Sequence, residues 1–255
     1  MVHLLNNNLS ERGDMMKIKK YLILVSLIFF VVTFFSCYPP AEYFPLNEED
    51  ERTYLYTIDI VGGPNDGLHL SIPVESVYYG KELVNGVQTI KVGGLPPNDD
   101  YFCWRKDFQG LKLCKLYRSM NNMYRIYKPQ LLLFPSWFNI GDVYERSYSV
   151  SIHSGDDDTL ILTLTGGTTV TFQSVEDVTV PAETFKDCPK ISLLGTYDKS
   201  TGGTYENSET IWFARNVGMV KQILIEKNSY LVEEDIEVTV TLELISATVD
   251  GITYE

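Results

Sequence analysis

The sequence predicts an all-β protein in which curved antiparallel sheets form an open barrel or a sandwich, after an N-terminal signal helix. Apolar and polar residues alternate with a period of two through much of the chain, which is the pattern of half-buried strands. Turn-forming residues recur about every eight to twelve positions, as in sandwiches and barrels. Helical spacing is rare after the first segment. These observations together predict about ten to fourteen strands.

The N-terminal segment has the layout of an export signal. A basic start, Lys17 to Lys20, precedes an apolar run from Tyr21 to Phe35, and the small residue Ser36 then precedes Cys37. A cysteine in this place resembles the lipidation site of bacterial lipoproteins, whose thiol is acylated, for example with palmitate. An uncleaved membrane anchor is the alternative, but the apolar run is shorter than the ~20 residues of a membrane span.

The expected organisation has three parts. The first is a signal peptide whose true start is Met15 or Met16. A proline-rich, acidic tether and a β domain follow it. The corresponding ranges are 1–36 for the signal peptide, 37–50 for the tether and 51–255 for the β domain.

Candidate strands follow one another through the β domain. They cover residues 53–61, 68–74, 78–84, 87–92, 160–165, 168–172 and 238–244. Asn85-Gly86 and Gly166-Gly167 each separate two of these runs and predict hairpins, because asparagine and glycine tolerate positive φ. Two further strands are expected on either side of Asn121-Asn122.

A faint internal repeat suggests two related halves, 51–130 and 131–255. Glu51 to Tyr54 reads Glu-Arg-Thr-Tyr, and Glu145 to Tyr148 reads Glu-Arg-Ser-Tyr. A Phe-Pro pair precedes each of them. Coincidence among β-rich segments is the alternative interpretation.

The cysteines suggest a disulfide rather than a metal site. Cys103 and Cys114 flank the predicted turn at Asp107 to Gly110, and a hairpin there would place them opposite each other. An exported protein meets an oxidising compartment, so a Cys103–Cys114 disulfide is expected, with two buried free thiols as the alternative. Cys188 has no evident partner and is expected in the core. No cysteine pair has metal-site spacing, so neither a metal nor another cofactor is expected.

The charge balance limits the partners. The full chain carries 34 acidic and 21 basic residues, a net charge of −13. Removal of residues 1–36 leaves 32 acidic and 17 basic residues, a net charge of −15. Such a surface argues against nucleic acid and repels anionic lipid, so membrane attachment should depend on the lipid at Cys37. Protein partners are not predicted. Tyr38 follows the cysteine in place of the aspartate of an inner-membrane retention signal, which favours the outer membrane of a bacterial cell envelope.

Three motifs carry a resemblance to a known family. They are Gly141-Asp142-Val143, the stretch from Val180 to Cys188, and the stretch from Trp212 to Lys221. In this order they resemble the TapB-like family of uncharacterised bacterial exported lipoproteins, although Glu183 and Asn216 stand where that family usually has glycine. The resemblance covers most of residues 43–250. It implies a curved antiparallel sheet, similar to the open barrels of periplasmic lipoprotein carriers, and an envelope location.

Catalytic patterns are weak, so an enzyme is not expected. Ser151 and His153 share one strand face, but nothing in the sequence supplies the acid and the oxyanion hole that a hydrolase needs. The acidic runs at 98–100 and 156–158 lack the spacing of a calcium loop and fit solvated turns better.

Two classes of function therefore remain. The first is a lipid-anchored binding module that holds an apolar small molecule or lipid in a β-barrel-like cavity. The second is a structural or protein-interaction lipoprotein with a solid core. Aromatic residues make up 13% of the chain and could line such a cavity, and Trp212 is the candidate ligand-binding residue. A contiguous void of roughly several hundred Å³ would favour the first class.

Overall fold

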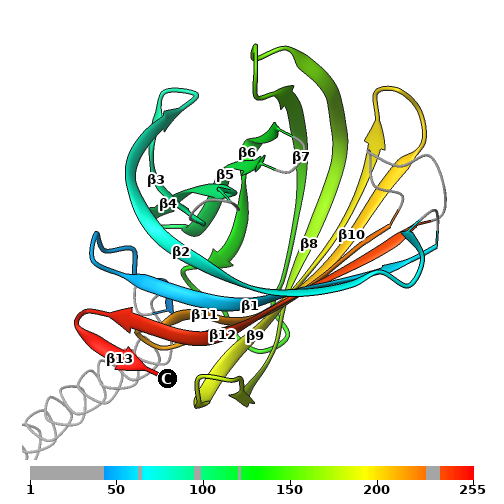
Figure 1. Ribbon diagram of the computed structural model, residues 1–255. Coiled ribbons are helices and arrows are strands. Elements are labelled where there is room, and N and C mark those ends of the chain that lie inside the picture. The colour runs from blue at the N-terminus through cyan, green and yellow to red at the C-terminus, as the bar shows by residue number, and fades with distance from the viewer. Residues whose placement is uncertain (1–42, 63–64, 95–98, 120–121, 228–235) are drawn as a thin grey trace, which may run out of the picture. The chain divides into compact units, whose positions relative to one another are not determined.

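The computed structural model describes residues 43–62, 65–94, 99–119, 122–227 and 236–255 (Figure 1). These residues form thirteen strands. The strands are β1 Glu51–Val61, β2 His69–Val84, β3 Val87–Gly93, β4 Tyr101–Asp107, β5 Gly110–Arg118, β6 Met123–Pro135, β7 Val143–Ser154, β8 Leu160–Thr179, β9 Thr184–Lys199, β10 Thr204–Ala214, β11 Gly218–Lys227, β12 Glu237–Val249 and β13 Ile252–Tyr254.

The strands form one antiparallel sheet that closes on itself. Each strand pairs with the next along the chain, and β1 also pairs with β12 over the full length of β1. Strands β1 to β12 therefore make a closed barrel, and the short β13 continues the sheet beyond β12. The all-β, antiparallel prediction is confirmed, and the barrel is closed rather than open. Closure pairs the backbone N–H and C=O groups that an open sheet would leave without hydrogen-bond partners at its two edges.

Local turn chemistry accounts for several of the connections. Asn85 and Gly86 have φ of 50° and 75°, and they join β2 to β3 as the sequence predicted. Asn216 and Gly218 also have positive φ, at 61° and 106°, and they lie at the connection between β10 and β11. The two strands expected before Val87 are a single strand, β2, with an irregularity between Tyr78 and Gly80.

The hairpin predicted at Gly166-Gly167 is wrong, because both glycines lie inside the continuous strand β8. A Cβ atom on Gly166 would lie 2.0 Å from the carbonyl oxygen of Thr196 and 2.7 Å from Cα of Tyr197. Glycine is therefore needed here for the close approach of the β9 backbone and not for a turn.

In the described part of the predicted tether, residues 43–46 and Asp50 pack against the barrel, whereas residues 47–49 are exposed. Tyr43 is 2% exposed and stacks on Phe134 with 5.7 Å between ring centroids. Phe44 lies 5.2 Å from the ring of Trp104. The tether prediction is thus corrected for Tyr43 and Phe44, because the side chains of these residues pack in the core and do not act as a flexible spacer.

The long hairpin of β8 and β9 extends past the turn between β10 and β11 and reaches β12. At its tip the backbone N–H of Ala182 donates to the carbonyl oxygen of Leu244 at 3.1 Å. Phe185 and Cys188, on the same hairpin, are buried with Leu244 in a second hydrophobic cluster, separate from the main one. Cys188 thus lies in the core as predicted.

Every strand pair and every core cluster named here lies within one compact unit, residues 39–255. The fragment 39–255 therefore contains the contacts that the barrel needs to fold by itself. Among the described residues there is no helix long and apolar enough to cross a membrane.

Candidate functional site

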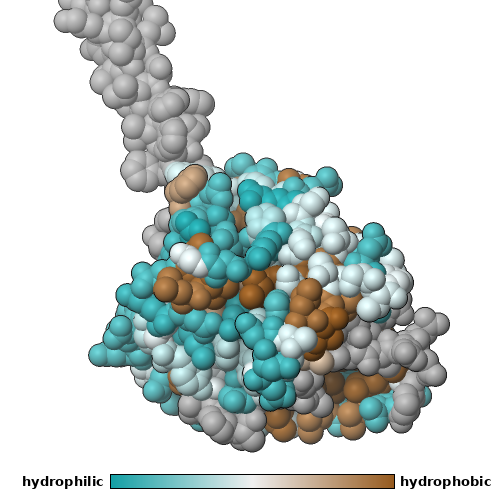
Figure 2. Space-filling model, turned by 90° about the horizontal axis from the view of Figure 1, so that it is seen from above, coloured by the Kyte–Doolittle hydropathy of each residue, from teal (hydrophilic) through white to brown (hydrophobic). Residues whose placement is uncertain are grey.

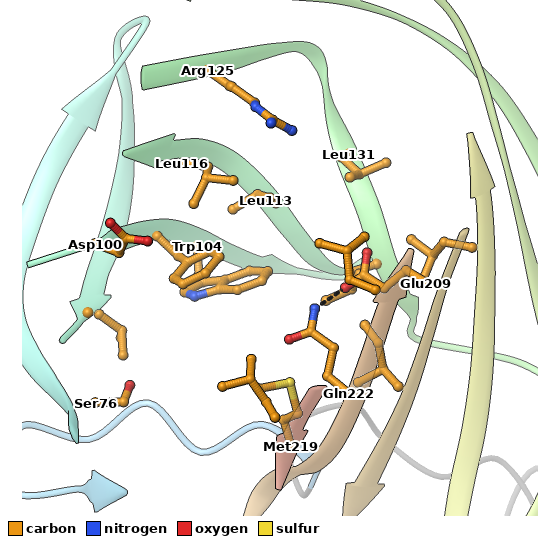
Figure 3. A pocket seen from close by; sticks show the side chains of 18 of the residues that line it. Ser76, Asp100, Trp104, Leu113, Leu116, Arg125, Leu131, Glu209, Met219 and Gln222 are labelled. Carbon is orange, nitrogen blue, oxygen red and sulfur yellow. Dashed lines mark hydrogen bonds between the residues drawn. The ribbon is translucent and has the colours of Figure 1, made fainter. Parts of the chain in front are cut away.

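The interior of the barrel contains a cavity of about 190 Å³, shown from close by in Figure 3. Each of the strands β1 to β12 contributes side chains to its lining, together with Phe44, Pro45 and Leu46. A twelve-stranded barrel encloses more space than its inward side chains fill easily, since barrel diameter grows with the number of strands. Large inward residues fill much of this space, and the cavity is what remains.

One part of the lining is apolar. Trp104 stacks on Phe102, two residues away on the inward face of β4, with 5.7 Å between ring centroids. Leu113, Leu131 and Met219 border the same space (Figure 3). This surface can contact an aliphatic chain without leaving polar groups unpaired.

Another part of the lining carries paired charges. Nη1 of Arg118 donates to Oδ2 of Asp100 at 2.9 Å. Nη2 of Arg125 lies 3.5 Å from Oε1 of Glu226. The hydroxyl of Tyr205 donates to the same Glu226 oxygen at 2.6 Å.

These contacts determine how Glu226 and Tyr205 titrate. Burial alone would raise the pKa of Glu226, but the positive charge of Arg125 and the hydrogen bond from Tyr205 outweigh burial and hold this pKa below its ordinary value. Burial, with the Glu226 carboxylate beside it, raises the pKa of Tyr205 well above its ordinary value. At neutral pH the carboxylate is therefore charged and the phenol is neutral.

Glu209 is a third carboxyl group in the cavity, and its surroundings differ. It lies on β10 and accepts a hydrogen bond from the side-chain amide of Gln222 on the neighbouring strand β11 (Figure 3). Its side chain is half-buried and lines the interior cavity. Burial, reinforced by the charge of Glu226, raises its pKa from 4.5 to about 7 against the opposing effects of Gln222 and Arg118.

Trp212, the predicted ligand-binding residue, does not line the cavity. Its neighbours Ile211 and Phe213 do, so Trp212 points to the opposite face of β10. There its indole N–H donates to Oε1 of Glu176 at 2.7 Å, and Nζ of Lys190 lies 5.1 Å from the ring centroid. The prediction of Trp212 as a lining residue is therefore wrong by one position: the residues on either side of it line the cavity, because successive side chains of a strand alternate between its two faces.

The predicted disulfide also differs from the structure, in which Cys103 and Cys114 are free, buried thiols. An irregularity between Cys103 and Trp104 shifts the register, so that Lys115 and not Cys114 lies opposite Cys103. Both cysteines pack with Val84 in a small cluster apart from the cavity. Burial raises the pKa of Cys103 to about 12 and that of Cys114 to about 11. The lipidation residue Cys37 and the predicted signal peptide lie outside the described residues.

Sequence reasoning missed Trp104 and the charged groups of the cavity. A signal was present on β10, where Tyr205, Asn207, Glu209, Ile211 and Phe213 alternate with outward residues and share the inward face. A glutamate between such residues indicates a polar group that faces the interior.

Comparison with known proteins gives a family match over part of the chain. Residues 116–235 match the family described as DUF3108-like. The three motifs quoted for the TapB-like resemblance lie within this region, but the match does not confirm the TapB-like family. No curated protein matches the chain.

Three solved structures are similar to this chain. A candidate exported protein with a YmcC-like fold from Bacteroides fragilis is 14% identical, with 79% of this chain and 97% of that chain covered and a TM-score of 0.41. A candidate lipoprotein from Parabacteroides distasonis is 16% identical, with coverages of 79% and 97% and a TM-score of 0.40. The hypothetical lipoprotein YmcC from Escherichia coli is 12% identical, with coverages of 75% and 83% and a TM-score of 0.40.

Proposed function

We propose that this protein is a lipid-anchored lipoprotein of the bacterial cell envelope, and that its barrel binds an apolar, single-chain ligand in the internal cavity. The observation that carries this proposal is the cavity itself, which a structural protein with a solid core would not need. Its apolar wall around Trp104 and Leu113 suits a hydrocarbon chain, and its polar groups suit one head group.

The size of the cavity limits the ligand. Its volume of about 190 Å³ is smaller than the void expected from the sequence and lies below the roughly 300–1,000 Å³ of pockets that hold drug-sized molecules. A short, narrow chain fits this space better than a lipid with several acyl chains. Each buried CH₂ group contributes about 0.8 kcal/mol of transfer free energy, so a short chain can bind with useful affinity after the cost of association is met.

The position of Tyr43 supports the proposed anchoring. Six peptide bonds separate Cys37 from Tyr43, and a chain of that length spans at most about 20 Å. A lipid on Cys37 would therefore hold the end of the barrel near Tyr43 close to the bilayer.

Exposed apolar residues lie at the same end. Phe108 is 83% exposed and Trp137 is 57% exposed, and their neighbours Gln109 and Ser136 are joined by a backbone hydrogen bond of 2.9 Å. On the face that Figure 2 shows, hydrophobic residues lie in groups between hydrophilic ones. We propose the outer membrane as the location, because Tyr38 differs from the aspartate of the retention signal.

Tryptophan fluorescence tests ligand binding, because Trp104 lines the cavity whereas Trp212 faces away from it. Delipidated fragment 39–255 should show a saturable change in emission when 1-octanol is added. Trp104→Phe should abolish this change, and Trp212→Phe, the matched control, should retain it. A response that is absent, or that rises linearly without saturation, would contradict the proposal.

Anchoring is tested separately in cells. Cys37→Ala should abolish incorporation of a palmitate analogue, because this thiol is the expected site of acylation. Unchanged labelling of the variant would refute lipidation at Cys37 without bearing on the cavity.

A further inference from the structure

Glu209 is the feature of the cavity that an apolar ligand alone leaves unexplained. Within the described part of the chain it forms no ion pair, and its hydrogen bond comes from the neutral amide of Gln222. An ionised carboxylate that burial withdraws from water is costly unless a positive charge or several hydrogen bonds compensate it.

The other charged groups that face this space are already compensated. Arg118 pairs with Asp100 across 2.9 Å, and Arg125 pairs with Glu226 across 3.5 Å. Arg52 also lines the cavity and pairs with Asp50 across 3.4 Å. Glu75 also lines the cavity but is exposed to solvent.

The nearby phenols carry no charge at neutral pH. Burial raises the pKa of Tyr56 and of Tyr205, and it raises the pKa of Tyr197 to about 12. When Glu209 is ionised, the cavity therefore gains a negative charge that forms no ion pair among the described residues, and the charge of Arg118 offsets it only in part.

We infer that the cavity selects a ligand with a cationic amino head group, which Glu209 binds, and an aliphatic chain that lies against Trp104 and Leu113. This inference rests on the proposed function, since it names the class of ligand for the same cavity. An ammonium group would complete the charge balance and donate a charge-assisted hydrogen bond to the carboxylate. A carboxylate head group would instead face the negative charges of Glu209 and Glu226.

Figure 3 shows that the two parts of such a ligand would have their partners in one continuous space. Glu209 and Gln222 border the same cavity as Trp104, Leu113 and Leu116. A primary alkylamine matches this arrangement, since it has one point charge at the end of an unbranched chain.

Three probes of equal chain length test the inference. Isothermal titration of fragment 39–255 at pH 8 should show that octylamine binds at least tenfold more tightly than 1-octanol, and that octanoate binds more weakly than either. The amine stays protonated between pH 6 and pH 8, whereas the ionised fraction of Glu209 falls from about nine-tenths to about one-tenth as the pH is lowered. Octylamine affinity should therefore fall about tenfold at pH 6, while 1-octanol affinity stays constant.

Two variants assign the effect to this carboxyl group. Glu209→Gln keeps the shape and the capacity for hydrogen bonds but removes the charge, so its affinities for octylamine and 1-octanol should agree within about twofold, at both pH values. Glu243→Gln is the matched control, because Glu243 pairs with Lys221 at 2.7 Å and does not line the cavity. It should keep the wild-type preference for the amine.

The possible outcomes distinguish the cation site at Glu209 from the proposed function, which is that the cavity binds an apolar ligand. If 1-octanol binds with saturation but octylamine shows no advantage, or if Glu209→Gln keeps that advantage, the cation site is refuted and the apolar cavity stands. If none of the three probes binds to the wild-type or to either variant, the proposed function fails, and the cation site fails with it.

Discussion

Replacing Gly166 with alanine should destabilise the barrel, because the new Cβ atom would clash with backbone atoms of β9, and no side-chain rotation can relieve such a clash. It would lie 2.0 Å from the carbonyl oxygen of Thr196 and 2.7 Å from Cα of Tyr197. Strands β8 and β9 would have to separate locally, and such overpacking typically costs about 1–3 kcal/mol. For a domain of this size 1 kcal/mol corresponds to about 2–4 °C, so the Tm should fall by about 2–12 °C. Urea unfolding of fragment 39–255 measures the free energy, and thermal unfolding measures the Tm, both followed by circular dichroism.

The adjacent glycine is the control. A Cβ atom on Gly167 would have one neighbour within 4 Å outside the adjoining residues, the carbonyl oxygen of Arg146, at 3.4 Å. Gly167→Ala should therefore be neutral, or stabilising by about 0.4–1 kcal/mol through a smaller entropy of the unfolded chain. A Gly166→Ala protein as stable as wild-type would refute the close-approach argument. Equal losses at both positions would indicate that the two glycines act together as a turn.

Three further predictions follow from the core. In the unreduced fragment, three thiols should react slowly with a thiol reagent in the native protein and rapidly after unfolding, namely those of Cys103, Cys114 and Cys188. A single reactive thiol in the unfolded protein would indicate a disulfide. Because the pKa of Glu209 is raised to about 7, the folded protein binds its proton more tightly than the unfolded chain does. The free energy of unfolding should thus fall by up to about 3 kcal/mol from pH 4.5 to 7, a fall that Glu209→Gln should remove in urea titrations. Phe213→Ala should cost about 3–5 kcal/mol in the same assay, because Phe213 is fully buried, and a loss below 1 kcal/mol would contradict its core position.

The parts of the fold that the sequence predicted correctly depend on local chemistry. Asn85-Gly86 needs positive φ at both positions, and these two residue types are favoured there by their own conformational preferences. Alternation in the C-terminal strand, now β12, likewise reflects one inward and one outward face.

The errors occurred where distant parts of the chain decide the role of a residue. Gly166 resembles a turn glycine in sequence, but the β9 backbone, about thirty residues away, is what requires it. The register that separates Cys103 from Cys114 depends on an irregularity between β4 and β5, which no local sequence pattern predicts.

The sequence left an interior cavity and a solid core as alternatives, and it did not identify the residues that line the cavity. Ile211, Trp212 and Phe213 are all buried, so apolar character could not distinguish the inward face of β10 from the outward one. Glu209 was missed because a single glutamate on a strand is typical of a solvated face. Its hydrogen bond with Gln222, which lies opposite Ile211 on the neighbouring strand, inside a closed barrel is a consequence of tertiary structure.

A crystal structure of fragment 39–255 with 8-bromooctylamine would test the central claim, that the barrel interior is a ligand site, most directly. The anomalous signal of bromine locates the end of the chain without assumptions about the protein. We predict one bromine peak inside the barrel near Trp104 and Leu113, with the amine beside Glu209. Bromine found only on the outer surface, with the interior unchanged, would contradict the account.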